Sequence, residues 1–517
     1  MDYTFPEKFD LIVVGTGVVE SMLSAAASRV GKTVLHIDTN DYYGGQWASF
    51  NLETITKLKN DDNSSSNVRN PLVLEENTYC LGNNVFNVEN VQFKYHIPNI
   101  PKKSDVSEDT SNMELDEKWS SERLLKESRK FNIDLAPKLQ FGRGDFVGLL
   151  ISSNISRYAE YRCVSRIITW LNGKLHVVPC SRADVFSNTN VTVIEKRMLM
   201  KVLTSLNDPE EDMKNYENQT FKDFLIDKKL SPNLIHFILY GISMSSDETP
   251  FSEGVGNAKR FLNSLGRFGK TPFLYSMYGS GELPQAFCRL SAVFGGVFAL
   301  GQTPQGIIMH DNKFKSLKLG SQHLEADHLI MSVDNSPQQF ITGVEKKYIS
   351  RAVLITSSSM IESEKEHLTL LFYPPENGKN TVTLIELGSL TGTCPKGLFL
   401  VHLISRQNIS PEEDFKHVVE NLFLSEPFET PEENETARKP EILWSAYFSL
   451  PDTSESDLKS NVPDNVFLCP GPDLDLDYDG SIKMARDIFK RMYDDLEFLP
   501  RAPDPEEIIL GEDEEGE

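Results

Sequence analysis

Residues 9–50 constrain the fold of this chain more than any other stretch. An apolar run, Leu11 to Val14, is followed by Gly15-Thr16-Gly17-Val18-Val19-Glu20, and a second apolar run, Val34 to Ile37, ends at Asp38. This order predicts a strand, a tight glycine turn, a helix and a second strand, which together form the first half of a dinucleotide-binding unit. The glycines would let a pyrophosphate approach the helix N-terminus. Asp38 stands roughly 20 residues further on, where an acid would bond a ribose hydroxyl.

The third glycine position of this pattern is occupied by Glu20. A carboxylate there adds bulk where helix and strand normally pack closely, and it places negative charge near a doubly negative pyrophosphate. We therefore predict that Gly15, Gly17, Glu20 and Asp38 form a relic of a dinucleotide turn, with no bound cofactor. The alternative is a flavin-dependent oxidoreductase, which the two glycines and the acid support.

Length and charge limit the remaining classes. A chain of 517 residues exceeds one ordinary core, so two or more domains are expected. The net charge is 52 − 76 = −24, which argues against nucleic acid as a partner. The six cysteines show no C-x-x-C spacing, so we predict reduced cysteines and no metal site. With no secretory segment, no transmembrane-length apolar run and no prenylation box, a cytosolic protein is expected.

The composition divides the chain into ordered and polar parts. We expect a large, discontinuous sheet-bearing domain made of residues 1–60, 70–190 and 270–500, and a small helical domain at 191–268. Polar, low-complexity runs predict flexible insertion segments. These segments are 61–70 and 101–118, with an acidic tail at 501–517.

Local patterns refine this division. A helix is predicted over 145–161, and Ile167 to Val178 predicts a hairpin through Asn172-Gly173. Within the small domain, helices are predicted at 192–205, 220–227, 233–243 and 254–265. Strands are predicted between 297 and 334 and again between 350 and 405, and a helix follows from 481 to about 495.

Two further blocks carry a resemblance to a known family. The motif L-H-x-D-x-N-x-Y-Y-G-G spans 35–45, and Y-G-x-G-E-L-P-Q-x-F-x-R spans 278–289. Together with G-T-G-x-x-E, they resemble the superfamily of Rab GDP-dissociation inhibitors and Rab escort proteins. The resemblance implies an α/β (α+β) fold: a flavin-monooxygenase-like, Rossmann-type sheet domain without bound flavin, and a smaller all-helical domain.

Several features are more similar to the escort branch than to the inhibitors. The chain is long, the insertion before Phe131 is large, and both the lead-in 119–129 and the end 500–510 look escort-like. This branch is known as component A of Rab geranylgeranyltransferase. The resemblance implies a non-catalytic protein that binds newly made, GDP-bound Rab GTPases. It would present them to the transferase α/β heterodimer and deliver the prenylated Rab to membranes through transient association. A Rab GDP-dissociation inhibitor is the alternative within the superfamily.

Carried onto this sequence, the Rab-binding platform of the family falls on Tyr43, Glu282 and Arg289. Glu282 and Arg289 are seven residues apart, so they would share one face of a helix. A carboxylate, a planar guanidinium and a tyrosine suit a polar protein surface. The alternative is an internal Glu–Arg pair that holds the start of the helix.

The helical segment raises a second choice. Its apolar residues at helical spacing form either an ordinary core or a pair of helices that separates to admit an isoprenoid chain, since burying lipid recovers about 0.8 kcal/mol per methylene. The candidate lipid-binding residues are Leu225, Leu234, Phe237, Ile238 and Met244. By family analogy the transferase contact falls within 233–268, and we expect Phe261 and Arg267 to be exposed there.

Overall fold

The computed structural model describes residues 4–58, 78–81, 87–97, 119–180, 184, 192–206, 214–376, 378–424 and 439–501. The predicted insertion segments 61–70 and 101–118 lie outside these residues. The predicted acidic tail, 501–517, also lies outside them except for Arg501.

An eight-stranded sheet contains the predicted dinucleotide unit. Its strand order is β12-β2-β1-β15-β14-β13-β4, and β21 pairs with β15. The strands from β12 to β15 and β21 run parallel, whereas β14, β13 and β4 are antiparallel. The bounds are β1 (Lys8–Val14), β2 (Val34–Ile37), β4 (Thr78–Cys80), β12 (Val297–Ala299), β13 (Gly306–His310), β14 (Lys313–Leu319), β15 (Gln322–Ser332) and β21 (Val466–Cys469).

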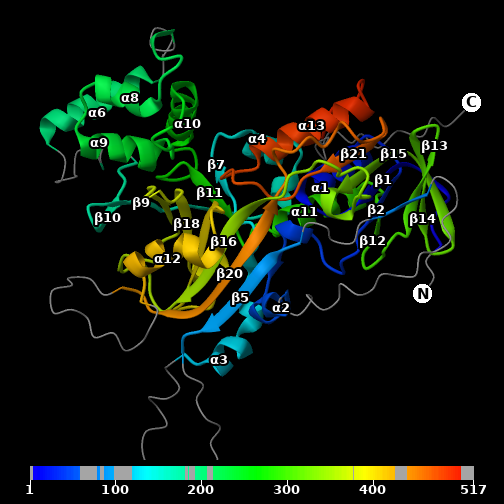
Figure 1. Ribbon diagram of the computed structural model, residues 1–517, viewed down its shortest axis with the longest axis horizontal. Helices are drawn as coiled ribbons and strands as arrows, with labels where there is room; N and C mark the ends of the chain where they lie inside the picture. The colour runs from blue at the N-terminus through cyan, green and yellow to red at the C-terminus, as the bar shows by residue number, and fades with distance from the viewer. Residues whose placement is uncertain are drawn as a thin grey trace, which may run out of the picture.

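Three helices cover one face of this sheet (Figure 1): α1 (Val18–Arg29) packs against both α11 (Glu282–Val293) and α13 (Asp479–Met492). Small residues on α1 allow the close approach to α11. The Oγ atoms of Ser24 and Ser28 each lie 2.9 Å from Oγ of Ser291. The helix predicted from 481 is confirmed, beginning two residues earlier.

A second eight-stranded sheet has the order β10-β9-β17-β18-β19-β16-β20-β5. Its strands are β5 (Glu89–Tyr95), β9 (Arg166–Leu171), β10 (Lys174–Val177), β16 (Lys347–Thr356), β17 (Thr369–Tyr373), β18 (Val382–Leu387), β19 (Phe399–Arg406) and β20 (Ile442–Asp452). Helix α12 (Pro411–Leu422) packs on β16 and β20. The predicted hairpin is confirmed as β9 and β10, with Asn172 and Gly173 both at positive φ.

Short elements connect the two sheets. They are η1 (Gly45–Trp47), β3 (Ser49–Phe50), α2 (Leu52–Lys57), α3 (Ser121–Lys126), η3 (Ser128–Lys130), β6 (Ile133–Asp134), β7 (Leu139–Phe141), α4 (Asp145–Ser152), η4 (Ile155–Arg157), β8 (Tyr161–Cys163), β11 (Phe273–Ser276), η6 (Val333–Asn335) and η7 (Ser389–Thr391). The helix predicted over 145–161 was wrong in its length. It ends at Ser152 because Asn154 takes the left-handed conformation, with φ of 62°, which terminates an α-helix.

The predicted helical segment gathers at the end of the molecule opposite the first sheet (Figure 1). It contains α6 (Val193–Ser205), α8 (Phe221–Asp227), α9 (Pro232–His236), the π-helix η5 (Phe237–Ile242) and α10 (Phe251–Ser264). Helix α6 begins with the capping box of Thr192 and Glu195. Helix α10 begins one turn before the predicted position, directly after Pro250.

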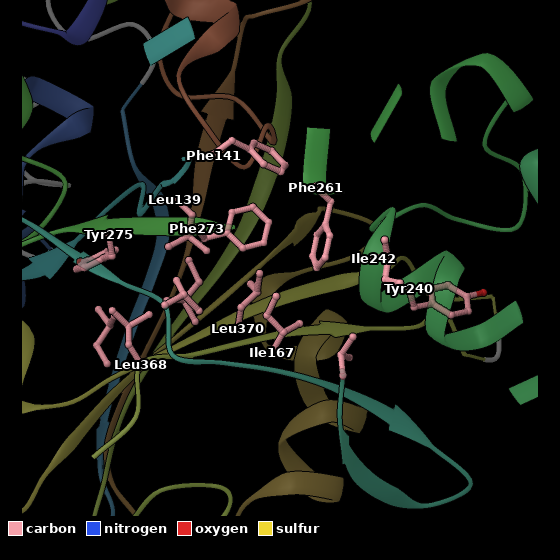
Figure 2. Packing of buried hydrophobic residues seen from close by; sticks show 14 of the residues in the cluster. Leu139, Phe141, Ile167, Tyr240, Ile242, Phe261, Phe273, Tyr275, Leu368 and Leu370 are labelled. Atoms are coloured by element: carbon pink, nitrogen blue, oxygen red, sulfur yellow. The ribbon is translucent and has the colours of Figure 1, made fainter. Parts of the chain in front are cut away.

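One continuous cluster of buried side chains joins these helices to the second sheet. Figure 2 shows Ile242 and Phe261 pointing toward Ile167 and Leu370 of the strands. The separation of 191–268 from the large domain therefore stays a prediction. In the part of the chain that the structure describes, no helix is long and apolar enough to span a bilayer.

Candidate functional site

The glycine turn between β1 and α1 has the geometry of a dinucleotide-binding loop. Gly15 has φ of +104°, and a Cβ there would lie 2.9 Å from Oγ of Ser332. Gly17 is the N-cap of α1 and uses no side chain to cap it. The turn therefore requires glycine at position 15 and brings the first sheet's backbone close to the N-terminus of α1, as predicted.

Glu20 occupies the space beside this turn. Its side chain is 1% exposed, and a Cβ on Gly17 would lie only 2.4 Å from its Oε2 atom. The carboxyl group therefore folds back over the turn, where a pyrophosphate would bind. No described residue hydrogen-bonds to Oε2 of Glu20.

Both carboxylate oxygens of Asp38 accept hydrogen bonds from other residues of the chain. Its carboxylate accepts hydrogen bonds from the Thr16 hydroxyl at 2.6 Å, from the Asn40 backbone at 2.8 Å and from the Asn40 side chain at 3.0 Å. The Thr16 hydroxyl in turn accepts from the Gly44 N–H at 2.8 Å. These bonds hold the loop of the glycine pair against the end of β2, so the acid predicted to meet a ribose fixes the backbone instead.

Three acids face the same hollow: Glu20 and Asp38, which are buried, and Asp334, which is partly exposed. Burial, followed by the charges of Asp334 and Asp38, raises the pKa of Glu20 to about 8. Burial and the Asp38 charge raise the pKa of Asp334 to about 8. Burial also raises the pKa of Asp38, although its hydrogen bonds act in the opposite direction.

The hollow between these acids measures about 30 Å³. That volume accommodates roughly one water molecule, whereas a flavin dinucleotide needs several hundred Å³. Three acids around so small a space do not fit a diphosphate. The described residues also contain no group of three or more His, Cys, Asp or Glu side chains arranged to bind a metal ion.

The predicted platform residues lie on and beside α11. Glu282 is the first residue of this helix and is half-buried, and Arg289 is exposed with its guanidinium 4.9 Å from the Tyr158 ring centroid. Tyr43 contacts the ring of Phe298 on β12 at 6.2 Å. The pKa of Tyr43 is raised by burial and by the neighbouring Cys288 of α11, which places Tyr43 against the helix that carries Arg289.

Glu282 and Arg289 form no salt bridge with each other among the described contacts, so the alternative of an internal pair gains no support. Burial and the charge of Asp134 raise the pKa of Glu282.

Asp134 forms hydrogen bonds that connect the elements carrying two of the predicted platform residues, Tyr43 and Glu282. No role was predicted for it from the sequence. It is fully buried and accepts hydrogen bonds from the Tyr275 hydroxyl at 2.7 Å, the Ser280 N–H at 2.9 Å and the Ser49 hydroxyl at 2.5 Å. Ser49 also accepts from the N–H of Gly281 at 2.9 Å. These bonds join the start of α11 to the loop that carries Tyr43. The only feature of the sequence that could have indicated this role is the presence of an acidic residue within a largely apolar block.

An exposed apolar strip extends along the end of α11 and into β12. Its members are Val293, Phe294 and Val297, with exposed fractions of 61%, 40% and 37%. We call these three residues the α11 strip. None of the three was among the predicted platform residues. Contiguous exposed apolar residues are typical of protein interaction surfaces.

The five candidate lipid-binding residues lie within the cluster that joins helices and sheet. Leu225, Leu234, Phe237 and Ile238 are buried, and Met244 is half-buried at a positive φ of 46°. A cavity of about 550 Å³ borders only Phe237 of these five. Its other walls come partly from the β9–β10 hairpin and the residue after it, including Ile167, Leu175 and Val178, and partly from Lys270, Thr271 and His367.

The two candidate transferase contacts differ in exposure. Phe261 was predicted to be exposed, and this was wrong: it is 1% exposed and packs against Phe273 at 6.0 Å. The helix turns this position inward, because Phe251, Val255, Ala258 and Phe261 follow one buried face. Arg267 is exposed as predicted, but it lies beyond the end of α10 and donates a hydrogen bond to the Gly142 carbonyl.

Two family profiles match parts of the chain. The profile described as GDP dissociation inhibitor matches residues 5–71, which contain the glycine turn and Tyr43. The profile described as RAE1/2 domain I, C-terminal region, matches residues 349–474.

Curated relatives match nearly the whole chain. Rab proteins geranylgeranyltransferase component A 1 of Homo sapiens is 33% identical, covering 99% of this chain and 94% of its own length. Rab proteins geranylgeranyltransferase component A of Drosophila melanogaster is 36% identical, covering 98% and 93%. Rab escort protein 1 of Arabidopsis thaliana is 27% identical, covering 99% and 97%.

Solved structures confirm the predicted fold. A Rab GDI from Plasmodium falciparum superimposes with a TM-score of 0.64 at 18% identity, covering 95% of this chain and 99% of the other. An oxidoreductase from Methanosarcina mazei has a TM-score of 0.53 at 12% identity, covering 93% and 100%.

Proposed function

The chain belongs to the Rab geranylgeranyltransferase component A family, which includes proteins named Rab escort protein, and we propose that it acts as a Rab escort protein. In this function it binds Rab GTPases and presents them to Rab geranylgeranyltransferase. We further propose that it takes up newly synthesised, GDP-bound Rab in the cytosol, presents it to the α/β heterodimer and delivers the prenylated product to membranes.

The observation that carries the Rab-binding proposal is the α11 strip beside the platform. Arg289 supplies an exposed guanidinium one helical turn before Val293, so charge and apolar surface meet on one face of α11. A central anchor with an apolar surround is the arrangement that concentrates binding energy in protein interfaces. Tyr43 and Glu282 complete this surface, and the hydrogen bonds of Asp134 make it rigid before the partner arrives.

The lipid proposal rests on the helical segment and its junction with the second sheet. We place the geranylgeranyl chain between η5 and the β9–β10 hairpin, because Phe237 lines both the buried cluster and the 550 Å³ cavity. Movement of Phe237 would connect the cavity with Leu234 and Ile238. The π-helical turn supports this placement, because such turns are rare and are frequently found at functional sites.

We still propose that the transferase contacts the segment 233–268, but through Arg267 and Phe268 instead of Phe261. Arg267 stands exposed beside Phe268, whose ring is 50% exposed and lies 5.1 Å from the guanidinium. This pair offers an aromatic and a charged group at the surface. For Phe261 to contact a partner, its ring would have to leave the core, so we treat it as a contact only in a rearranged state.

We propose that the chain itself is a non-catalytic accessory component. The glycine turn does not fit a dinucleotide, because Glu20 fills the pyrophosphate position and the remaining hollow is about 30 Å³. Asp38 holds the loop of the glycine pair through its hydrogen bonds with Thr16 and Asn40.

A reconstituted prenylation assay tests the proposal. Unprenylated Rab–GDP, geranylgeranyl pyrophosphate and the transferase heterodimer are mixed with and without this protein, and lipid transfer is followed by mass spectrometry. Transfer that requires the protein is the expected result. Rab binding without transfer would identify a GDP-dissociation inhibitor, and loss of both would refute the Rab-binding proposal.

Two substitutions test the platform separately. Tyr43→Ala and Arg289→Ala should each weaken Rab binding by about 2 kcal/mol, the usual cost of losing an interface anchor. Arg486→Ala is the matched control, since it removes an exposed arginine from α13, a different helix. Titration calorimetry measures the affinities, and unchanged affinity in both platform variants would contradict the assignment.

A further inference from the structure

A pocket beside α13 shares no lining residue with the predicted Rab platform or with the proposed lipid site. It measures about 420 Å³ and lies between α13, the segment 456–466 and β21. Leu458, Val462, Phe467, Met484 and Ile488 make its apolar part. The volume falls within the range of pockets that bind small ligands or a few side chains. We call it the α13 pocket.

Basic side chains border this apolar floor. Lys459, Lys483 and Arg491 all line the pocket and are exposed, and none of them forms a salt bridge with another described residue. The Arg491 guanidinium lies 4.8 Å from the Phe467 ring centroid, over the pocket wall. Two acids, Asp457 and Asp487, are also present, so the rim carries one excess positive charge. The chain as a whole has a net charge of −24, which makes this basic rim unusual on its surface.

The described chain ends beside this helix. After α13 the backbone turns back, so that the Phe498 ring lies 5.5 Å from that of Phe489, and Leu499 is buried. Arg501 is the last described residue. The sequence beyond it contains one apolar triplet, Ile508-Ile509-Leu510, within a stretch that carries eight acids between 504 and 517 and no basic residue.

We propose that the α13 pocket is the docking site for this segment of the same chain. Ile508-Ile509-Leu510 occupies the apolar floor, and the carboxylates of Glu506, Glu507 and Glu512 pair with the basic rim. The segment thus matches the pocket in both of its properties, aliphatic side chains for the floor and negative charge for the rim. Three aliphatic residues in a highly charged segment gain free energy when they leave water.

The segment after Arg501 is long enough to extend along the whole pocket. Ile508 lies seven positions after Arg501, and seven extended steps of the chain span about 23 to 25 Å. The part of α13 that lines the pocket runs from Gly480 to Arg491, about 16 Å along the helix axis. Attachment to the same chain also supplies an effective concentration of about 1 mM or more, which favours the chain's own segment over a second copy.

Hydrogen–deuterium exchange on the full chain tests the proposal. The triple substitution Ile508→Ser, Ile509→Ser, Leu510→Ser removes the apolar side chains and keeps all eight acids. It lies outside every described element, so far-UV circular dichroism should be unchanged. We expect amides of 456–468 and 480–491 to exchange severalfold faster in this variant than in the unmodified chain. Equal exchange in the two chains would overturn the proposal.

Charge reversal on α13 provides a matched pair of variants. Lys483→Glu changes the pocket rim, whereas Lys490→Glu changes an exposed lysine on the same helix that does not line the pocket. The first should reproduce the faster exchange at 456–468, and the second should not. Equal effects of the two reversals would overturn the proposal. So would protection that disappears on tenfold dilution, since that result would assign the pocket to a second copy of the chain.

Discussion

Replacing Glu20 with glutamine should change how the stability of this protein depends on pH. The wild-type carboxyl group is 1% exposed, and burial together with Asp334 and Asp38 raises its pKa from 4.5 to about 8. The folded protein therefore holds a proton on Glu20 at pH values where the unfolded chain has released it. This contribution to stability is complete below pH 4.5 and is lost as the pH rises toward 8.

The size of this effect follows from the one proton that Glu20 binds in the folded protein and has released in the unfolded chain. Within that window the contribution of Glu20 to the free energy of unfolding falls by about 1.4 kcal/mol per pH unit, or about 3 kcal/mol from pH 5 to pH 7.5. Glutamine has nearly the same shape and carries no titrating proton, so the part of the slope that comes from Glu20 should disappear in the Glu20→Gln variant, whereas Asp334, whose pKa is also raised to about 8, keeps its own contribution.

Urea unfolding between pH 5 and pH 8, followed by tryptophan fluorescence, measures the effect. The exposed Glu364→Gln serves as the control, and its curve should run parallel to that of the wild type. We expect the difference in unfolding free energy between Glu20→Gln and wild type to grow with pH in favour of the variant. Parallel curves for Glu20→Gln and wild type would show that Glu20 is ionised in the folded protein, which would refute the reasoning.

Three further substitutions test the packing that positions the site. Gly241→Ala should destabilise the helical segment by at least 1 kcal/mol in thermal unfolding, because the new Cβ would lie 2.8 Å from Val178; unchanged stability would mean that η5 can move aside. Phe261→Ala should cost about 3 to 5 kcal/mol in the same measurement, and a cost below 1 kcal/mol would contradict its burial. Asp134→Asn should weaken Rab binding in calorimetry by loosening the start of α11, with Tyr275→Phe giving a smaller loss; normal affinity in both would show that their hydrogen bonds do not position the platform.

The sequence predicted the fold where local pattern and long-range packing agree. The apolar run Leu11 to Val14 became a parallel strand buried on both faces, and the Asn172-Gly173 pair became the predicted hairpin turn. The helices of the small segment were also found, because Thr192 and Thr220 mark their beginnings with capping boxes.

What the sequence did not predict depends on contacts distant in the chain. Asp134 is one acid in an apolar block, and its importance arises only when Ser49, Tyr275 and Ser280 come together around it. The inward orientation of Phe261 depends on the strand that contains Phe273, which helical spacing alone does not reveal. The platform residues came from the family resemblance, and the α11 strip could be seen only once β12 was placed beside α11.

The parallel pairing of β1 with β15 also has a consequence during synthesis on the ribosome. Val14 is made about 308 residues before Gln322, so at about 5 to 20 residues per second the first strand waits roughly 15 to 60 s for its partner. During that interval one edge of this strand, in which five of the seven residues are apolar, has no neighbour, which is the condition that favours aggregation. Production of this protein should therefore depend on chaperones that hold nascent chains, and slower translation should increase that dependence.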